Sequence, residues 1–202
     1  MMLSKKTQLR NGVYIEAINS ELFTADEWTG SLTPNSVVVI QDEVRFRIAL
    51  TQPSSTMQIH SNSLEDLEDY SMSISDIAQA KLDMKSAENT ANIMTMPGAI
   101  DYAAGYCKSF TFPDGKTKGL LPALGWLQTA YDNRAAVDTC LAACGAMAMG
   151  MTDPYWSSTL LGVGPYNDNI YWSLNWIDGY VDYDIVDVGC LVRAFATYEA
   201  AS

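Results

Sequence analysis

Four cysteines and a single histidine are the side chains of this sequence best suited to nucleophilic, redox or metal chemistry. No two cysteines have the two-residue spacing of a zinc knuckle. Cys140 and Cys144 lie four residues apart in a helical stretch, so we expect two small buried side chains on one helix face. Histidine-dependent catalysis and histidine-ligated metals would all depend on His60, which lies in a polar run and is expected in a solvated loop. The sequence therefore predicts no enzyme.

Residues 152–198 lack four residue types. They contain no Lys, Glu, Gln or Met, although these types supply 31 residues in the rest of the chain, so about nine would be expected here. Randomising the two adenines of an Asn codon never produces Lys, Glu, Gln, Met or Trp. Between positions 160 and 191, only Trp172 and Trp176 fall outside the set that such randomisation produces. The stretch is therefore typical of randomised Asn codons in a constant framework.

The same stretch has the composition of a binding surface. Eight of the 21 aromatic residues lie within positions 155–183, beside Asn, Ser, Gly and Asp. Tyrosine offers a large contact area with little rotamer entropy to lose, and the small polar residues adapt their hydrogen bonds, as in an antibody paratope. The alternative is that the tyrosines only pack a hairpin core. For Tyr171 and Tyr180 we favour binding, because they alternate with the tryptophan positions.

A hairpin around Asp178-Gly179 would carry this surface, because Asp-Gly accepts the positive dihedral angles of a tight turn between alternating strands. Side chains at every second position of a strand share one face. The residues expected to point inward are Trp172, Leu174, Trp176 and Val181, and those expected to point outward are Tyr171, Ser173, Asn175, Tyr180 and Asp182.

The other elements follow from hydrophobic spacing. Short strands are predicted at 13–15, 37–40 and 44–50, with a hairpin turn at 41–43. Residues 63–91 and 99–107 have helical character. The clearest helix runs from Pro122 to about Cys144, with a break near 132–133 and Gly145 past its end. Residues 191–198 are predicted as the closing strand.

Length and charge restrict the partners of the chain. With 202 residues, 48% of them hydrophobic, one globular domain is expected. The formal net charge of -12 makes nucleic acid a poor partner, because its phosphates would be repelled. No apolar segment typical of a secretory signal peptide follows the first lysines, and no segment is apolar enough to span a membrane. We therefore expect no Sec signal and no membrane insertion.

Three motifs carry a resemblance to a known family: PYWSST at 154–159, WSLNW at 172–176 and VRAFAT at 192–197. With the Asp178-Gly179 turn, they resemble the C-terminal signature of the variable proteins of diversity-generating retroelements, in which mutagenic reverse transcription rewrites Asn codons. The segment GLLPALGWLQ at 119–128 is similar to the helix that precedes this signature in gut-phage and prophage members. The resemblance covers about residues 95–198.

This resemblance implies an α+β, C-type lectin-like fold in which the first and last strands pair and the variable residues lie on a hairpin and loops at one face. Residues 1–50 would form a strand-rich N-terminal extension with a β-hairpin, packed on or part of the main domain. Residues 51–202 would form the lectin-like domain, with its variable region at about 155–192. The implied function is non-enzymatic binding of a protein or glycan on a host or target cell surface, by a phage tail protein or a cell-surface protein. The oligomeric state is left open, a homo-oligomer included.

Two other functions are weighed against it. One is a structural virion or surface protein without a diversified site. The other is an oxidase of the formylglycine-generating type, which shares this fold, but Cys140, Cys144 and Cys190 match no active-thiol motif.

Calcium is the one cofactor that the resemblance raises, since sugar-binding lectins of this fold use it. Asp182 and Asp184 could supply carboxylate oxygens, which calcium prefers. The lectin ligand motifs Glu-Pro-Asn and Trp-Asn-Asp are both missing. We therefore expect no cofactor. Six Asp residues lie within 152–192 without any Lys or Arg among them, and we interpret them as a solvated face that favours a basic partner.

The site residues fall into two sets. The diversified, ligand-binding positions, expected on one exposed face, are Tyr166, Asp168, Ile170, Tyr171, Ser173, Ile177, Asp178, Tyr180, Asp182, Tyr183, Asp184 and Ile185. The constant scaffold beneath them is expected to be Trp156, Trp172, Leu174, Trp176, Val192, Arg193 and Phe195. Arg193 is expected in an ion pair or a clamp on carbonyl groups rather than in ligand contact.

Overall fold

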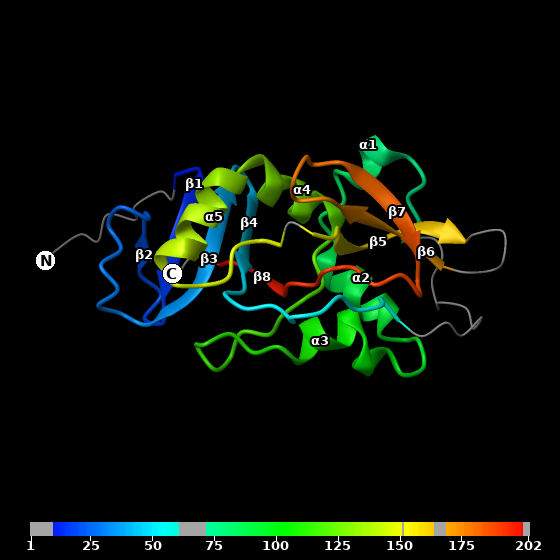
Figure 1. The fold of residues 1–202 in the computed structure, drawn as a ribbon, viewed down its shortest axis with the longest axis horizontal. Helices are drawn as coiled ribbons and strands as arrows, with labels where there is room; N and C mark the ends of the chain where they lie inside the picture. The colour runs from blue at the N-terminus through cyan, green and yellow to red at the C-terminus, as the bar shows by residue number, and fades with distance from the viewer. Residues whose placement is uncertain (1–9, 61–71, 151, 164–168, 200–202) are drawn as a thin grey trace, which may run out of the picture.

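The computed structural model describes residues 10–60, 72–150, 152–163 and 169–199. It is a mixed α+β structure with two antiparallel sheets, as expected for the α+β class. Figure 1 shows the larger sheet towards the N-terminal end of the molecule and the smaller sheet at the other end, with helices packed between and around them. Among the described residues, no helix combines the length and apolar character that crossing a bilayer requires.

The larger sheet has five strands in the order β2-β1-β3-β4-β8. Their bounds are Gly12–Ala17 (β1), Leu22–Phe23 (β2), Pro34–Gln41 (β3), Val44–Ile48 (β4) and Phe195–Thr197 (β8). The strands predicted at 13–15 and 37–40 are confirmed, and those predicted at 44–50 and 191–198 are shorter than expected, at Val44–Ile48 and Phe195–Thr197. The turn between β3 and β4 is closed by Asp42 with a φ of 54°. Aspartate is one of the few residues that tolerate this left-handed conformation.

The last strand does not pair with the first, so this expectation is wrong. Strand β8 pairs with β4, with Phe195 opposite Ile48 and Thr197 opposite Phe46. Strand β1 has no edge left for β8, because β2 and β3 occupy its two sides. Residues 12–48 therefore share one sheet with the end of the chain.

The smaller sheet contains two of the three motifs of the family resemblance. Its strands are Tyr155–Val163 (β5), Asn169–Leu174 (β6) and Val181–Ile185 (β7), with β6 in the centre. PYWSST lies on β5 and the first part of WSLNW lies on β6, whereas VRAFAT ends in β8 of the larger sheet. The predicted hairpin is confirmed: β6 and β7 pair with Leu174 opposite Val181 and Ser173 opposite Asp182. Gly179 in the connecting turn has a φ of 73°, a conformation that glycine adopts without strain.

The helices are short. Their bounds are Ile77–Ala80 (α1), Ser86–Ile93 (α2), Ala99–Asp101 (η2, a 3-10 helix), Ala103–Ser109 (α3), Leu124–Asp132 (α4) and Arg134–Ala143 (α5). The predicted break in the longest helical run falls at Asn133, whose side-chain amide donates to Thr129 O and to Gln41 Oε1. Residues 63–71 of the predicted 63–91 helix lie outside the described residues, and the described part forms α1 and α2 with a gap between them.

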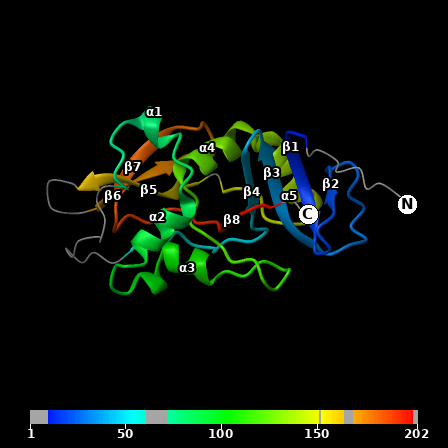
Figure 2. The same cartoon turned by 180° about the vertical axis from the view of Figure 1, so that it is seen from behind.

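Two hydrophobic clusters cover the two faces of the smaller sheet. Trp172 and Leu174 belong to a cluster that includes residues of α4 and α5. Tyr171 and Trp156 belong to the other, with residues of α2 and α3 and of the segments at 57–60 and 186–196. In Figure 2, α2 and α3 lie on the side of the smaller sheet opposite α4. All six residues of β6 are buried as a result.

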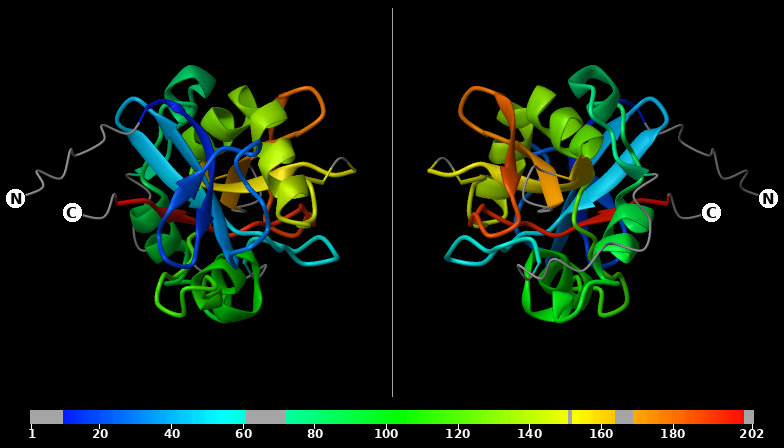
Figure 3. Two further views of the ribbon diagram at one scale, coloured as in Figure 1. Left: turned by 90° about the vertical axis from the view of Figure 1, so that its left-hand side faces the viewer. Right: turned by 90° about the vertical axis from the view of Figure 1, so that its right-hand side faces the viewer.

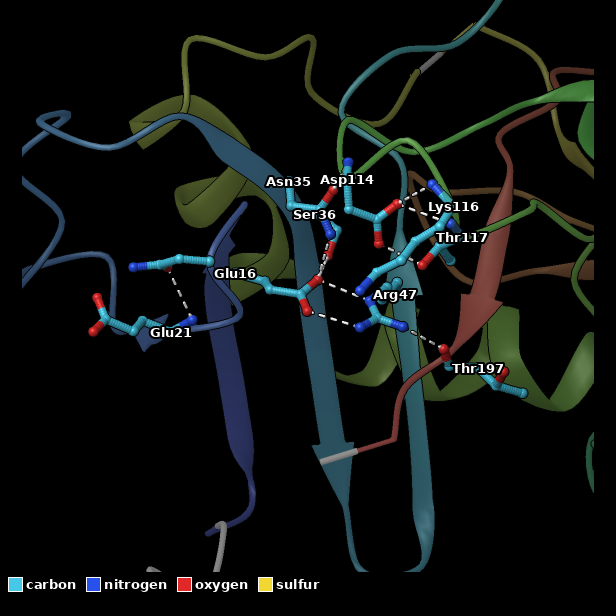
Figure 4. A network of polar contacts seen from close by, with 10 residues as sticks. Glu16, Glu21, Asn35, Ser36, Arg47, Asp114, Lys116, Thr117 and Thr197 are labelled. Carbon is cyan, nitrogen blue, oxygen red and sulfur yellow. Dashed lines mark hydrogen bonds and ion pairs between the residues drawn. The ribbon is translucent and has the colours of Figure 1, made fainter. Parts of the chain in front are cut away.

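A buried ion pair ties the larger sheet together. The Arg47 guanidinium on β4 donates to both carboxylate oxygens of Glu16 on β1, at 2.8 Å each. Asn35 and Ser36 on β3 also donate to Glu16 Oε2, at 2.8 and 2.7 Å. Arg47 further donates to the Thr197 carbonyl on β8, so one network joins four strands of this sheet (Figure 4).

Candidate binding surface

The β7 strand and the residues on either side of it form an exposed surface at the outside of the smaller sheet. The end views in Figure 3 show this hairpin beside the α4–α5 pair. Tyr180 and Tyr183 have 63% and 52% of their area exposed, which is unusual for aromatic side chains. The exposed residues of this β7 surface are Ile177, Asp178, Tyr180, Asp182, Tyr183, Ile185, Asp187 and Val188.

Half of the predicted ligand-binding positions lie on this surface. The six exposed ones are Ile177, Asp178, Tyr180, Asp182, Tyr183 and Ile185. A seventh predicted position, Asp184, lies between Tyr183 and Ile185 and is half-buried. Tyr166 and Asp168 lie outside the described residues. Ile170, Tyr171 and Ser173 are buried, so the expectation that these three side chains share the exposed face is wrong.

The error comes from the position of β6 in its sheet. The alternation itself is correct, because Tyr171 and Ser173 pair with Asp184 and Asp182 and share their face. That face is covered over β6, the central strand, and open only over β7, the edge strand. Tyr171 and Ser173 are both 0% exposed there.

His60 is one of the residues that cover β6 on this face, so the expectation that it lies in a solvated loop is wrong. Its side chain is fully buried, with its ring edge-on to Tyr171 at 5.6 Å between centroids. Its Nε2 atom lies 3.4 Å from Asn169 Nδ2. The backbone holds the segment in place, since Ile59 N–H donates to Val186 O and Met57 pairs with Cys190. One feature of the sequence indicated that this segment is buried, the apolar Ile59 next to His60.

The expected scaffold residues are all buried: Trp156, Trp172, Leu174, Trp176, Val192, Arg193 and Phe195. Each of the three indole N–H groups also has a hydrogen-bond acceptor. Trp156 donates to Met57 O at 2.8 Å and Trp172 donates to Ile74 O at 2.9 Å. Trp176 donates to Asp138 Oδ2 at 3.2 Å. These bonds fix the tryptophans in orientation as well as in depth.

Arg193 forms the carbonyl clamp that was expected. Its guanidinium donates to the Met147 and Ala148 carbonyls at 2.8 and 3.1 Å, and to Gln52 Oε1 at 2.9 Å. Desolvation by burial lowers the pKa of Arg193 below its usual range, although nearby acidic groups oppose this. The residue therefore anchors the segment between β7 and β8 from the inside.

The β7 surface carries uncompensated negative charge. Asp178, Asp182 and Asp184 form no ion pair with any described residue. Asp178 and Asp182 accept the backbone N–H groups of Tyr180 and Tyr183, at 3.0 and 2.9 Å. Partial burial, and then the charge of Asp182, raise the pKa of Asp184. The carboxylates therefore repel each other and would gain from a cationic neighbour.

The thiols and the acidic groups of the described residues are candidates for nucleophilic chemistry and metal binding. Burial raises the pKa of all four thiols, to about 11 for Cys140 and Cys144, so they are protonated at neutral pH and weak nucleophiles. The described part of the chain contains no group of three or more His, Cys, Asp or Glu side chains placed to hold a metal ion. Asp182 and Asp184, the two carboxylates that could supply calcium ligands, lie on one face of β7 but are not part of such a group.

Comparison of this chain with protein-family models, with curated proteins and with solved structures found no match.

Proposed function

We propose that this chain is a non-enzymatic ligand-binding protein, a variable protein of a diversity-generating retroelement with a C-type lectin-like fold. Its binding face is the β7 surface. Its ligand is a protein or glycan on a host or target cell, and it acts from a phage tail or a cell surface. The observation that carries this proposal is the coincidence of two features: the stretch that lacks Lys, Glu, Gln and Met also holds exposed Tyr, Ile and Asp over a buried scaffold.

The two sets of residues separate stability from display. The tryptophans are buried and hydrogen-bonded, so their replacement would remove packing and leave acceptors without a donor. The exposed positions on β7 contact solvent, where substitutions usually change stability by less than about 0.5 kcal/mol. A surface that must change often, without unfolding the protein, requires this division.

Reading the DNA around the gene tests the proposal. We expect a near-copy of the coding region for residues 155–197, with adenines where the gene differs, beside a reverse transcriptase gene. The differences should include the codons of Tyr180, Asp182 and Tyr183, and the codons of Trp172 and Trp176 should be identical in both copies. A locus without any such copy would favour the alternative, a structural virion or surface protein without a diversified site.

A further inference from the structure

Among the described residues, nothing pairs with the outer edge of β7, whereas the outer edge of β5 is covered. Along β5, Trp156 N–H donates to Leu191 O, Ser158 N–H donates to Pro122 O, and Leu160 O accepts from Ile74. No described residue pairs in this way with Val181 or Tyr183 on the outer side of β7. An open strand edge is a template for another strand.

The register shows which backbone groups point out of this edge. Asn175 N–H donates to Tyr180 O, and pairs in an antiparallel ladder alternate between bonded and non-bonded positions. Residues 182 and 184 therefore bond to β6, and residues 181 and 183 direct their backbone groups outward. At the end of the strand, Ile185 O accepts from Val188 N–H. Tyr183 N–H confirms this direction, because it donates to the side chain of Asp182 at 2.9 Å instead of to β6.

The two faces of β7 differ in chemistry. Asp182 and Asp184 lie on one face, and Val181, Tyr183 and Ile185 lie on the other, where Tyr183 packs edge-on against Trp172. A strand added at this edge would place alternate side chains beside carboxylates and beside apolar groups. The complementary segment has Lys or Arg at every second position and apolar or aromatic residues between them.

We infer that the β7 edge binds an extended, cationic segment of a partner protein by strand addition, with basic side chains beside Asp182 and Asp184. The inference rests on the proposed binding role of the β7 surface and names its partner class. A second copy of this chain does not fit, because its net charge is -12 and its own β7 edge presents the same carboxylates. Charge complementarity and backbone pairing then act together, as in other strand-addition complexes.

The test uses peptides of about six to eight residues, a common strand length. A panel alternates Lys or Arg with Val, Thr or Tyr, and titration calorimetry with the full chain measures the dissociation constants. We expect members of the panel to bind at micromolar concentrations, and two changes to weaken them at least about tenfold. One is N-methylation of alternate backbone amides, and the other is clustering the same basic residues at one end of the peptide.

Two variants of the protein make the test specific to the edge. Tyr183→Pro removes an outward N–H without removing a bond to β6, and proline is tolerated at such edge positions. Tyr183→Ala is the matched control, because both variants lack the tyrosine ring. We expect the proline variant to bind the alternating peptide at least about tenfold more weakly than the alanine variant, with thermal unfolding confirming that both are folded.

The inference is overturned if no panel member binds at about 1 mM, or if N-methylated and clustered peptides bind as well as the alternating ones. If the proline variant does not fold, the N-methylated peptide alone decides between the outcomes. Peptide binding that depends only on charge would contradict strand addition, but it would not contradict the proposal that the β7 surface is a diversified binding face. The search for a near-copy of the gene tests that surface independently.

Discussion

At the scale of single residues, burial and hydrogen bonding separate side chains that the sequence pattern treats alike. Ser157 and Ser173 are both fully buried and lie on neighbouring strands. Ser157 Oγ donates to Trp172 O at 2.7 Å. Ser173 Oγ has no hydrogen-bond partner among the described residues. Two serines in similar surroundings therefore contribute to stability with opposite sign.

Ser157→Ala should lower the free energy of unfolding by about 1–3 kcal/mol, because it leaves a buried carbonyl without its donor. Ser173→Ala should leave it unchanged or raise it by up to about 1 kcal/mol, because it removes a desolvated hydroxyl. Urea unfolding of both variants measures the difference. Equal destabilisation by the two substitutions would show that Ser173 Oγ is satisfied in solution.

The assignment of scaffold and display residues has its own test. Trp172→Ala should cost about 3–5 kcal/mol, a large share of a typical stability of about 5–15 kcal/mol. Tyr180→Ala and Asp182→Ala should each change stability by less than about 0.5 kcal/mol. Thermal unfolding of the three variants decides the matter. A stable Trp172→Ala protein, or unfolded Tyr180 and Asp182 variants, would reverse the two roles.

At the scale of elements, the β6–β7 hairpin is held against α4 at its turn. A Cβ atom on Gly179 would overlap the ring of Tyr131, and the guanidinium of Arg134 stacks on that ring with its carbon 4.5 Å from the ring centroid. Tyr131 also packs edge-on against Trp176. The β6–β7 hairpin is thus packed against α4 at its turn, and the exposed residues of the β7 surface project from this contact.

Gly179→Ala should destabilise the protein more than Gly115→Ala, its matched control. Both glycines have φ angles near 74°, where a side chain costs about 1–2 kcal/mol, but only Gly179 has a ring in the way. We expect an extra cost of about 1–3 kcal/mol from overpacking. The extra cost should vanish in a Tyr131→Ala background, as a double-mutant cycle by chemical denaturation would show. Equal costs in both backgrounds would mean that the turn does not contact α4.

At the scale of the whole molecule, the chain end joins the two sheets. The segment after β7 passes the Arg193 clamp and enters the larger sheet as β8, where Thr197 O accepts from Arg47. Arg47 in turn pairs with Glu16. The β7 surface lies on the smaller sheet, and the network that closes the chain lies on the larger one. Substitutions on the β7 surface are therefore expected to leave the closure of the fold intact.

Glu16→Gln should lower stability at pH 7 by about 3 kcal/mol, because it leaves the largely buried Arg47 without its counter-charge. Burial alone would raise the pKa of Glu16, but bonds from Arg47, Ser36 and Asn35 and the charge of Arg47 lower it below 4.5. Since the folded-state pKa is depressed, the stabilisation is complete above the unfolded-state pKa and is lost as the pH falls through the folded-state value.

The difference between wild type and Glu16→Gln should therefore shrink as the pH falls below 4.5. Urea unfolding at several pH values measures it. The Glu43→Gln variant, which removes an exposed carboxylate, serves as the control. A difference that stays constant down to acid pH would show that the charge of Glu16 is not the source of its contribution.

Local patterns determined much of this structure. Hydrophobic spacing predicted β1, β3 and β4 of the larger sheet but not β2, Asp178-Gly179 predicted the hairpin, and the break near Asn133 divided the longest helical run. The burial of Trp172 and Trp176 also followed from the sequence, since period two assigns side chains to faces. These features depend on neighbours in the chain, which the sequence displays directly.

Only the tertiary structure decided which faces and edges were covered. Tyr171 is buried in a cluster with Ile59, from a segment distant in sequence, and its ring contacts the buried His60 of the same segment. Strand β8 pairs with β4 because β1 is already flanked on both sides. Periodicity groups side chains by face, but whether a face meets solvent depends on segments that arrive from elsewhere in the chain.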